Sequence, residues 1–208
     1  MGASASFLDA EEGYEPIRVG QRKRVVLFDF DKTLAAVDVN LYSQQGVAAL
    51  GGHDRVKSLD SMLAAIRSFG CDLGIVSFNS RSTVVKTLNA ARLLRHFRAR
   101  DCYGIEQHPK GDLDKAKLTF AKIMKPRGIR PQDVCFVDDN GDNLRDLRAN
   151  RNTKGCELHH VRTGMGMDDE DMERVVRWAE GKKPPRRRKT DRLATRASWK
   201  APAEIVSD

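Results

Sequence analysis

The stretch RVVLFDFDKTL, residues 24–34, decides the fold of this chain. Its residues 25–29 form a continuous apolar run that ends in an acid, which predicts a strand buried on both faces of a parallel sheet. Two aspartates, Asp29 and Asp31, follow the apolar residues and are separated by Phe30. A carboxylate at the edge of a core costs free energy unless it has partners. The two acids therefore call for a chemical explanation.

Strand patterns alternate with helix patterns along the rest of the chain. We predict further strands at 73–77, 133–139 and 156–161, and a short one within 99–105. We predict helices at 58–69, 81–94, 113–124 and 142–149, and a last one around 175–178. This alternation predicts an α/β fold, a Rossmann-like parallel sheet with helices on both faces.

The chain of 208 residues is long enough for one such domain, which we place at residues 23–180. Residues 1–22 lack a hydrophobic period and are predicted to be flexible. Residues 181–208 hold nine Lys/Arg and three Asp/Glu, so this predicted disordered tail carries most of the net charge of +8. Because the body is nearly neutral, the high pI does not by itself predict a nucleic-acid-binding fold.

The four cysteines do not have the spacing of a metal or redox motif. Cys71 and Cys135 lie in or beside apolar runs, where a thiol acts as a small hydrophobe. We therefore expect a reduced, cytoplasmic protein. We find neither an apolar stretch of membrane-spanning length nor a signal peptide in the sequence.

The N-terminus MGASAS matches the N-myristoylation pattern through Gly2 and Ser6, although small residues are also common in disordered segments. One myristoyl chain needs a second membrane signal, and the basic run KKPPRRRK at 182–189 offers one. The same run suits a nuclear address or a nucleic-acid contact. Its simplest interpretation is a solvated tail.

Polar residues close three of the predicted strands: Asp29, Ser77 and the pair Asp138 and Asp139. Carboxyl ends of parallel strands meet at one edge of the sheet, and ligands bind there. A single polar ending such as Ser77 is explained as well by a turn or a helix cap. Three endings together predict a functional site.

Asp29 and Asp31 are suited to two different roles in phosphoryl transfer. Residues two apart in a strand point to the same side. Asp29 is suited to attack a phosphorus atom as a carboxylate nucleophile. Asp31 is suited to protonate the leaving oxygen and then to deprotonate water. The two acids need opposite protonation states, so their surroundings must differ.

A dianionic phosphate approaches a group of carboxylates only if a cation lies between them, and Mg²⁺ suits oxygen ligands. We expect the side chains of Asp29 and Asp139 and the carbonyl oxygen of Asp31 to hold the metal. Asp138 and Asn143 are expected to orient these ligands. Ser77 and a lysine would stabilise charge on the transferred phosphoryl group.

These residues resemble the haloacid dehalogenase (HAD) superfamily of phosphohydrolases over about residues 24–178. DFDKT at 29–33 resembles the first motif, Ser77 the second, and FVDDNGDN at 136–143 the fourth. The acid at position 31 implies phosphatase rather than dehalogenase chemistry. The resemblance adds Thr33 as a phosphate contact. Asn79 is a further phosphate-contact candidate, although it and Arg81 also fit a helix start capped by Ser80.

The third motif of the superfamily is one lysine at the start of a helix. Lys115 and Lys117 in DLDKAKLTF both fit it, and Lys110 is a more distant candidate. We choose Lys117 as the catalytic lysine and keep Lys115 as its alternative. The other lysines are expected on an exposed helix face.

The gaps between the motifs are too short for a large cap domain. Residues 34–57 suit a flap, and residues 78–116 suit one helix, a short strand and a loop. An open site admits a phosphorylated protein side chain, a nucleic-acid end or a bulky sugar phosphate. This arrangement, the fourth motif and HHVRTGM at 159–165 resemble the magnesium-dependent phosphatase subfamily, which is linked with phosphotyrosine and sugar-phosphate hydrolysis. We interpret His159 and His160 as structural residues.

The leading hypothesis is a Mg²⁺-dependent phosphomonoester hydrolase that acts through an aspartyl-phosphate on a phosphorylated protein or small molecule. One alternative is a polynucleotide end phosphatase whose basic tail holds the nucleic acid. A second is a non-catalytic binding module with the same fold. A phospho-accepting receiver domain is disfavoured, because its acid pair normally comes first in the chain and here it comes last.

Overall fold

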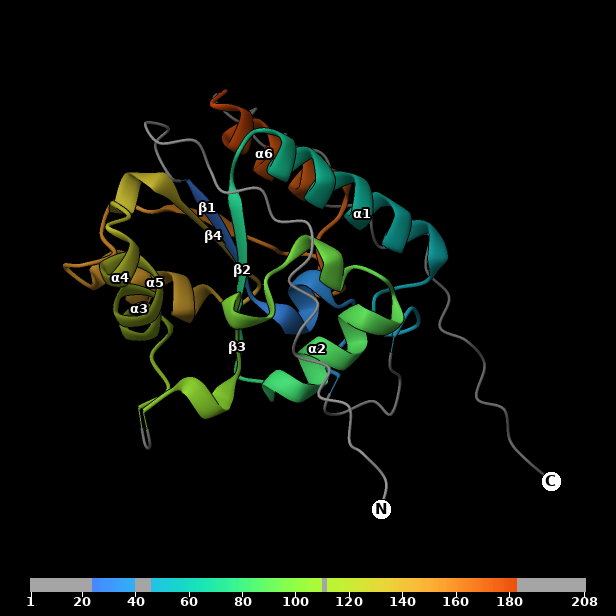
Figure 1. Cartoon of the computed structure of the whole chain (residues 1–208), viewed down its shortest axis with the longest axis horizontal. Coiled ribbons are helices and arrows are strands. Elements are labelled where there is room, and N and C mark those ends of the chain that lie inside the picture. Colours follow the sequence, from blue (N-terminus) through green and yellow to red (C-terminus); the bar gives the residue numbers. More distant parts are fainter. Residues whose placement is uncertain (1–23, 40–45, 110–111, 183–208) are drawn as a thin grey trace, which may run out of the picture.

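The computed structural model describes residues 24–39, 46–109 and 112–182 of the chain (Figure 1). The predicted flexible segment with Gly2, the tail beyond Lys182 and Lys110 lie outside these residues. Within them, no helix is both long enough and apolar enough to cross a membrane.

Five parallel strands form one sheet in the order β3-β2-β1-β4-β5. The strands are β1 (Val25–Phe28), β2 (Asp72–Val76), β3 (Cys102–Tyr103), β4 (Val134–Asp138) and β5 (Glu157–His160). The central strand β1 pairs with β2 and β4, so that Phe28 is in register with Ile75 and Val137. The predicted parallel α/β sheet is confirmed.

The main helices are α1 (His53–Ser68), α2 (Arg81–Ala90), α5 (Gly141–Ala149) and α6 (Asp169–Glu180). A further helical run comprises α3 (Lys115–Leu118), the π-helical turn η5 (Thr119–Met124) and α4 (Lys125–Arg127). Shorter helical turns are η1 (Phe30–Leu34), η2 (Leu94–His96), η3 (Ala99–Asp101), η4 (Ile105–Gln107) and η6 (Pro131–Asp133).

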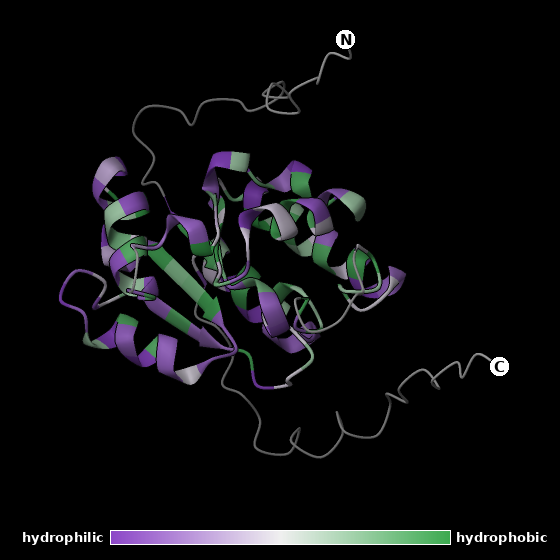
Figure 2. Cartoon of the chain, turned by 90° about the horizontal axis from the view of Figure 1, so that it is seen from below, coloured by the Kyte–Doolittle hydropathy of each residue, from purple (hydrophilic) through white to green (hydrophobic). Residues whose placement is uncertain are grey.

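Helices cover both faces of the sheet, which explains why β1 and β2 are buried at every position (Figure 1). Val26 and Phe28 of β1 face a core that α1, α2 and α6 complete. Val25 and Leu27 face a second core, to which α3, η5 and α5 contribute. Figure 2 shows mostly hydrophobic strands between helices in which hydrophobic and hydrophilic residues alternate. Cys71 and Cys135 are buried in the first core, as predicted.

Several helix boundaries differ from the predictions, and two of the differences have a clear physical reason. Helix α1 begins at His53 rather than near Ser58, because its polar first turn adds nothing to the hydrophobic period. The helix predicted to end before Pro126 continues to Arg127 and ends at Gly128, whose φ of 63° is left-handed. Just before the proline the helix widens, and the Lys125 N–H donates to the carbonyl of Phe120. This π-helical turn departs from the α-helical pattern that Pro126 would interrupt.

The strand order creates one opening at the carboxyl edge of the sheet. After β1 the chain adds β2 and β3 on one side, and it then returns to add β4 and β5 on the other. The connections that leave β1 and β4 therefore run to different faces of the sheet. Such a switch point is the usual ligand site of an open parallel sheet. Asp29 and the pair Asp138 and Asp139 lie at this point.

Candidate active site

Three carboxylates meet at the switch point, and we call Asp29, Asp138 and Asp139 the acid cluster. One oxygen of each lies within 4.8 Å of the others. Their meeting follows from the register of β1 and β4, which the Asp29 N–H extends by donating to the carbonyl of Val137 at 2.8 Å. Asp29 is 6% exposed and Asp138 is fully buried. Asp139 is half-buried, so two of the three acids are buried, and a nearby cation would offset the cost of ionising them.

Lys115 supplies a cation from within the chain. Its Nζ donates to Asp29 Oδ1 at 2.7 Å and to Asp138 Oδ2 at 2.8 Å. The side chain is 2% exposed. Lys115 is the first residue of α3, where Asp114 caps the helix by accepting from the Ala116 and Lys117 N–H groups. The start of this helix therefore directs one lysine onto two carboxylates.

The structure brings Lys115 to the acid cluster and does not bring Lys117, the predicted catalytic lysine, to it. The Lys117 side chain is 58% exposed, and its Nζ pairs with Asp112 at 2.7 Å. Residues two apart on a helix point in nearly opposite directions, so only one of these lysines can face the acid cluster. Spacing along the sequence could not decide which one, because the phase of a short helix depends on its packing.

Burial sets the protonation of the acid cluster. Desolvation raises the pKa of Asp29 to about 7, although Lys115 favours the ionised form. Burial and then the charge of Asp138 raise the pKa of Asp139. Burial works against a charged Lys115, but Asp29 and Asp138 outweigh it and raise the pKa of Lys115. One lysine thus balances only part of the charge of three acids, and a further cation would be stabilised there.

The donor set fits a hard divalent cation. Asp138 is already occupied, because it accepts from Lys115, from the Asn140 N–H at 2.8 Å and from Asn143 Nδ2 at 3.2 and 3.1 Å. Asn143 thus holds the Asp138 carboxylate, and the orienting role expected of both residues stays a prediction. Carboxylate oxygens of Asp29 and Asp139 are suitable ligands for such a cation.

Asp31 lies in different surroundings from Asp29. The chain turns sharply after β1, and Lys32 has a φ of 53°. The Asp31 carboxylate accepts from the Val39 N–H at 2.8 Å and from Asn79 Nδ2 at 3.2 and 3.1 Å. Burial raises the pKa of Asp31, against the opposing effect of these neutral donors. The two acids of the first motif therefore have ionic and neutral partners respectively.

Ser77 and Asn79 connect the end of β2 to Asp31. Ser77 is fully buried, and its Oγ accepts from the Asn79 N–H at 3.0 Å. The Asn79 amide then reaches Asp31, while Ser80 caps α2 by accepting from the Thr83 N–H. The predicted cap at Ser80 is confirmed. Asn79 contacts a catalytic candidate, whereas Arg81 donates to the carbonyls of Cys102 and Ala99 and is structural.

Thr33 joins the first motif to the fourth. The sequence predicts Thr33 as a phosphate contact, whereas its hydroxyl oxygen accepts from the Asp139 N–H at 3.1 Å. The side chain is fully buried. This contact favours a positioning role, because it fixes the loop of Asp139 relative to the loop of Asp29.

Arg55 is a residue that sequence reasoning missed. Its guanidinium donates to four carbonyl oxygens: Leu34 and Leu50 at 2.7 Å, Thr33 at 3.1 Å and Met167 at 3.3 Å. Burial lowers the pKa of Arg55 to about 10. Gly166 has a φ of 78°, and a Cβ there would lie 2.3 Å from the Arg55 guanidinium. Arg55 thus holds the loop after β1 against two other loops.

Phe78 and His108 border the buried lysine and were also missed. The Phe78 ring centroid lies 4.8 Å from Lys115 Nζ and 5.1 Å from the His108 ring. Burial, and next the charge of Lys115, lower the pKa of His108. The position of Phe78 directly after Ser77 was the one available signal for this pair.

The two histidines of β5 have structural partners, as predicted. His159 Nε2 lies 2.8 Å from Asp171 Oδ1, and both side chains are buried. His160 Nε2 lies 2.9 Å from the carbonyl oxygen of Asp139. His160 therefore supports the backbone of the acid cluster from the β5 side.

No protein-family model matches the chain, and no curated protein matches it. Similar solved structures include the HAD domain of the effector Lem4 from Legionella pneumophila, at 13% identity over 67% of this chain and 86% of that one, with a TM-score of 0.46. A phosphoserine phosphatase is 14% identical over 68% and 94%, with a TM-score of 0.41. The 3-deoxy-D-manno-octulosonate 8-phosphate phosphatase of Moraxella catarrhalis, in complex with magnesium and phosphate ions, is 13% identical over 76% and 88%, with a TM-score of 0.47. At this distance, neither activity nor substrate carries over to this chain.

Proposed function

We propose that the chain is a Mg²⁺-dependent phosphomonoester hydrolase that acts through an aspartyl-phosphate on Asp29. The observation that carries the proposal is the buried Lys115, held by Asp29 and Asp138 at the carboxyl ends of two adjacent strands. A binding module would have little use for this costly group of buried charges. The sequence resemblance to HAD phosphohydrolases, through DFDKT and FVDDNGDN, agrees with it.

The two aspartates of the first motif would carry the two steps. The Asp29 carboxylate attacks the phosphorus atom, and the leaving-group oxygen takes a proton from Asp31. In the second step Asp31 removes a proton from water, the water oxygen attacks the phosphorus, and the Asp29 carboxylate leaves. Phosphate is released, and Asp31 holds a proton for the next cycle. The raised pKa of Asp31 suits its first role as an acid.

The other residues would balance charge and keep the reacting groups in position. Mg²⁺, when bound by the Asp29 and Asp139 carboxylates and the Asp31 carbonyl oxygen, supplies positive charge for the incoming phosphate. Lys115 takes the catalytic position that the sequence left between two lysines, and it balances charge beside Asp29. We keep Ser77 and Asn79 as candidate phosphate contacts, and Asp138 and Asn143 as groups that orient the metal ligands.

An open site would admit a phosphoprotein side chain or another bulky phosphate. The described residues between β1 and α1, 35–39 and 46–52, form turns, which agrees with this proposal. We propose 23–180 as the catalytic domain, with 1–22 and the basic tail 181–208 as flanking segments. Because this tail is basic, we keep a polynucleotide end phosphatase as the alternative function. Deletion of 181–208 would then weaken hydrolysis of nucleic-acid substrates and leave a small aryl phosphate unaffected.

A screen of phosphorylated compounds, run with Mg²⁺ and with a chelator, tests the proposal. We expect release of inorganic phosphate from at least one compound, dependent on Mg²⁺ and abolished in Asp29→Asn. The panel should hold aryl phosphates, phosphopeptides, sugar phosphates and 5′-phosphorylated oligonucleotides. No release from any of them by the folded protein would contradict the proposed function.

A further inference from the structure

A second concave site, with the opposite charge, lies between α5, the end of β5 and α6. This cavity of about 380 Å³ has six basic residues in its lining: Arg145, Arg148, Arg162, Arg174, His159 and His160. Its lining contains no aspartate or glutamate. Because residues 1–180 are close to neutral, the four arginines of this lining are a local concentration of positive charge. We call this site the arginine cavity.

Two elements of secondary structure bring the basic residues together. Arg145 and Arg148 are three positions apart on α5, so they lie on one side of that helix. His160 ends β5, Arg162 follows two positions later, and both line the cavity. A Cβ on Gly141 would lie 3.5 Å from the His160 ring, so the ring packs against the start of α5. The arginines of the two elements therefore converge.

The partners of these side chains show which of them can take a ligand. The His159 ring is held by the buried Asp171. Arg145 pairs with Asp142 at 2.6 Å, but both side chains are more than 70% exposed, and such pairs are weak. Within the described part of the chain, no ion pair joins Arg148 or Arg162 to an acid. These two exposed arginines are the best placed to bind an anion.

The arginine cavity adjoins the acid cluster. His160 lines the cavity and contacts the Asp139 carbonyl oxygen at 2.9 Å. Gly141, also in the lining, comes two residues after Asp139. An anion in the cavity would therefore lie on the other side of the loop that carries Asp138 and Asp139.

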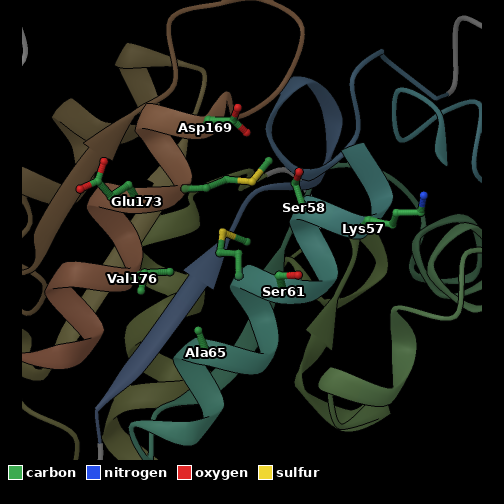
Figure 3. Close-up of a pocket in the computed structure, with 9 residues that line it drawn as sticks. Lys57, Ser58, Ser61, Ala65, Asp169, Glu173 and Val176 are labelled. Carbon is green, nitrogen blue, oxygen red and sulfur yellow. The ribbon is translucent and has the colours of Figure 1, made fainter. Parts of the chain in front are cut away.

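A second hollow, between α1 and α6, makes a useful contrast. Figure 3 shows Lys57 and Ser58 of α1 across from Asp169 and Glu173 of α6. This hollow has a volume of about 470 Å³, and no residue of the acid cluster lines it. Its acids and its lysine oppose each other in charge, so the lining favours no class of ligand. The arginine cavity is different, because its charges have one sign.

We propose that the arginine cavity binds a phosphate-class oxyanion. The planar guanidinium group donates paired hydrogen bonds that match phosphate and sulfate oxygens. Two sources could supply such an anion. One is a second phosphate group on the substrate, and the other is inorganic phosphate after its release. Binding itself is independent of the proposed hydrolysis, whereas the assignment of its source rests on that function.

Sulfate serves as the probe of binding, because it has the charge and shape of phosphate and is not a substrate. The side-chain Nε–Hε signals of arginine are followed by NMR during a sulfate titration of the full chain, at ionic strength held constant with chloride. We expect saturable shifts for Arg148 and Arg162. In the double variant R148Q/R162Q, sulfate affinity should fall by at least about tenfold.

The control is the double variant R151Q/K154Q, which removes the same charge from two exposed residues outside the cavity. It should keep wild-type sulfate affinity. Absence of saturable shifts, or equal affinity in R148Q/R162Q and wild type, would overturn the proposal. This experiment needs no catalytic activity, so its failure is separate from failure of the proposed function.

Kinetics then identify the source of the anion. If it is a second substrate phosphate, R148Q/R162Q should raise KM for adenosine 3′,5′-bisphosphate by at least about tenfold, and KM for adenosine 5′-monophosphate should change less than about twofold. If it is released phosphate, added inorganic phosphate should alter monophosphate turnover in the wild type beyond simple competition. That additional effect should be absent in R148Q/R162Q. Either pattern supports the arginine cavity as a phosphate site, and each names a different source.

Discussion

Asp29 and Asp31 are two residues apart, but the chain surrounds them differently. Asp29 lies in a buried ionic cluster with Lys115 and Asp138. Asp31 lies in the turn beyond β1, where the Asn79 amide and the Val39 N–H are neutral donors. Burial raises the pKa of both carboxyl groups, that of Asp29 to about 7, but the charge of Lys115 favours the ionised form of Asp29, whereas the hydrogen-bond partners of Asp31 are neutral donors. A cation beside Asp29 would favour the nucleophilic carboxylate, and the raised pKa of Asp31 suits an acid. The difference shows how one residue type can supply both groups of a two-step reaction.

The largest expected effect comes from removing the nucleophile. Asp29→Asn keeps the shape of the side chain but removes the attacking carboxylate, so kcat should fall by about a thousandfold or more. Steady-state assays measure this loss, and thermal unfolding checks that the variant folds. Wild-type turnover in this variant would remove Asp29 from the mechanism.

The second largest effect is expected from Asp31→Asn. It removes the general acid and base, and kcat should fall by about a hundredfold to ten-thousandfold. With an activated aryl phosphate, the first step needs little acid assistance, so the phosphorylated enzyme should accumulate. Rapid-mixing experiments should show a burst of the phenol product followed by slow turnover. Equal rates for both steps would mean that Asp31 does not serve as the base.

Lys115 and Lys117 lie in the same helix, and their substitutions should have different effects. Lys115→Met leaves Asp29 and Asp138 without their cation, so activity should fall by about a hundredfold or more. The same change should lower the free energy of unfolding by about 3–5 kcal/mol, because it breaks a buried ion pair. Lys117→Met is the matched control and should retain activity within about twofold, since its partner Asp112 is at the surface. Denaturant unfolding and kinetics of both variants test this. A greater loss of activity in Lys117→Met would reverse the assignment.

The smallest expected effect concerns pH and the metal. Burial raises the pKa of Asp29 to about 7 and also raises the pKa of Asp139, so protons compete with Mg²⁺ for these oxygens. As pH rises through this range the carboxyl groups lose protons, and Mg²⁺ affinity should increase. The increase in Tm caused by Mg²⁺ should therefore be larger at about pH 8 than at about pH 6. In Asp139→Asn the increase should be smaller at both values. A Mg²⁺ effect independent of pH would contradict the protonation of these acids.

The sequence predicted the sheet and the acids because these features are local. The apolar run before Asp29 and the run before Asp138 each indicate a buried strand, and parallel strands bring their carboxyl ends together. Lys115 could not be distinguished from Lys117, because the phase of a helix that begins after a loop depends on packing. Arg55 could not be found, because it falls in the predicted flap at 34–57, where a single arginine normally indicates an exposed side chain. The arginine cavity joins α5, β5 and α6, and only the tertiary structure brings those residues together.

The central claim is that Asp29 carries the phosphoryl group. It is tested by quenching the reaction in acid during turnover, reducing the protein with borohydride and mapping its peptides, because borohydride converts an aspartyl-phosphate to homoserine. The account predicts homoserine at position 29, in larger amount in Asp31→Asn and absent in Asp29→Asn. Homoserine at another aspartate, or an unmodified position 29 in Asp31→Asn during its slow turnover, would contradict it.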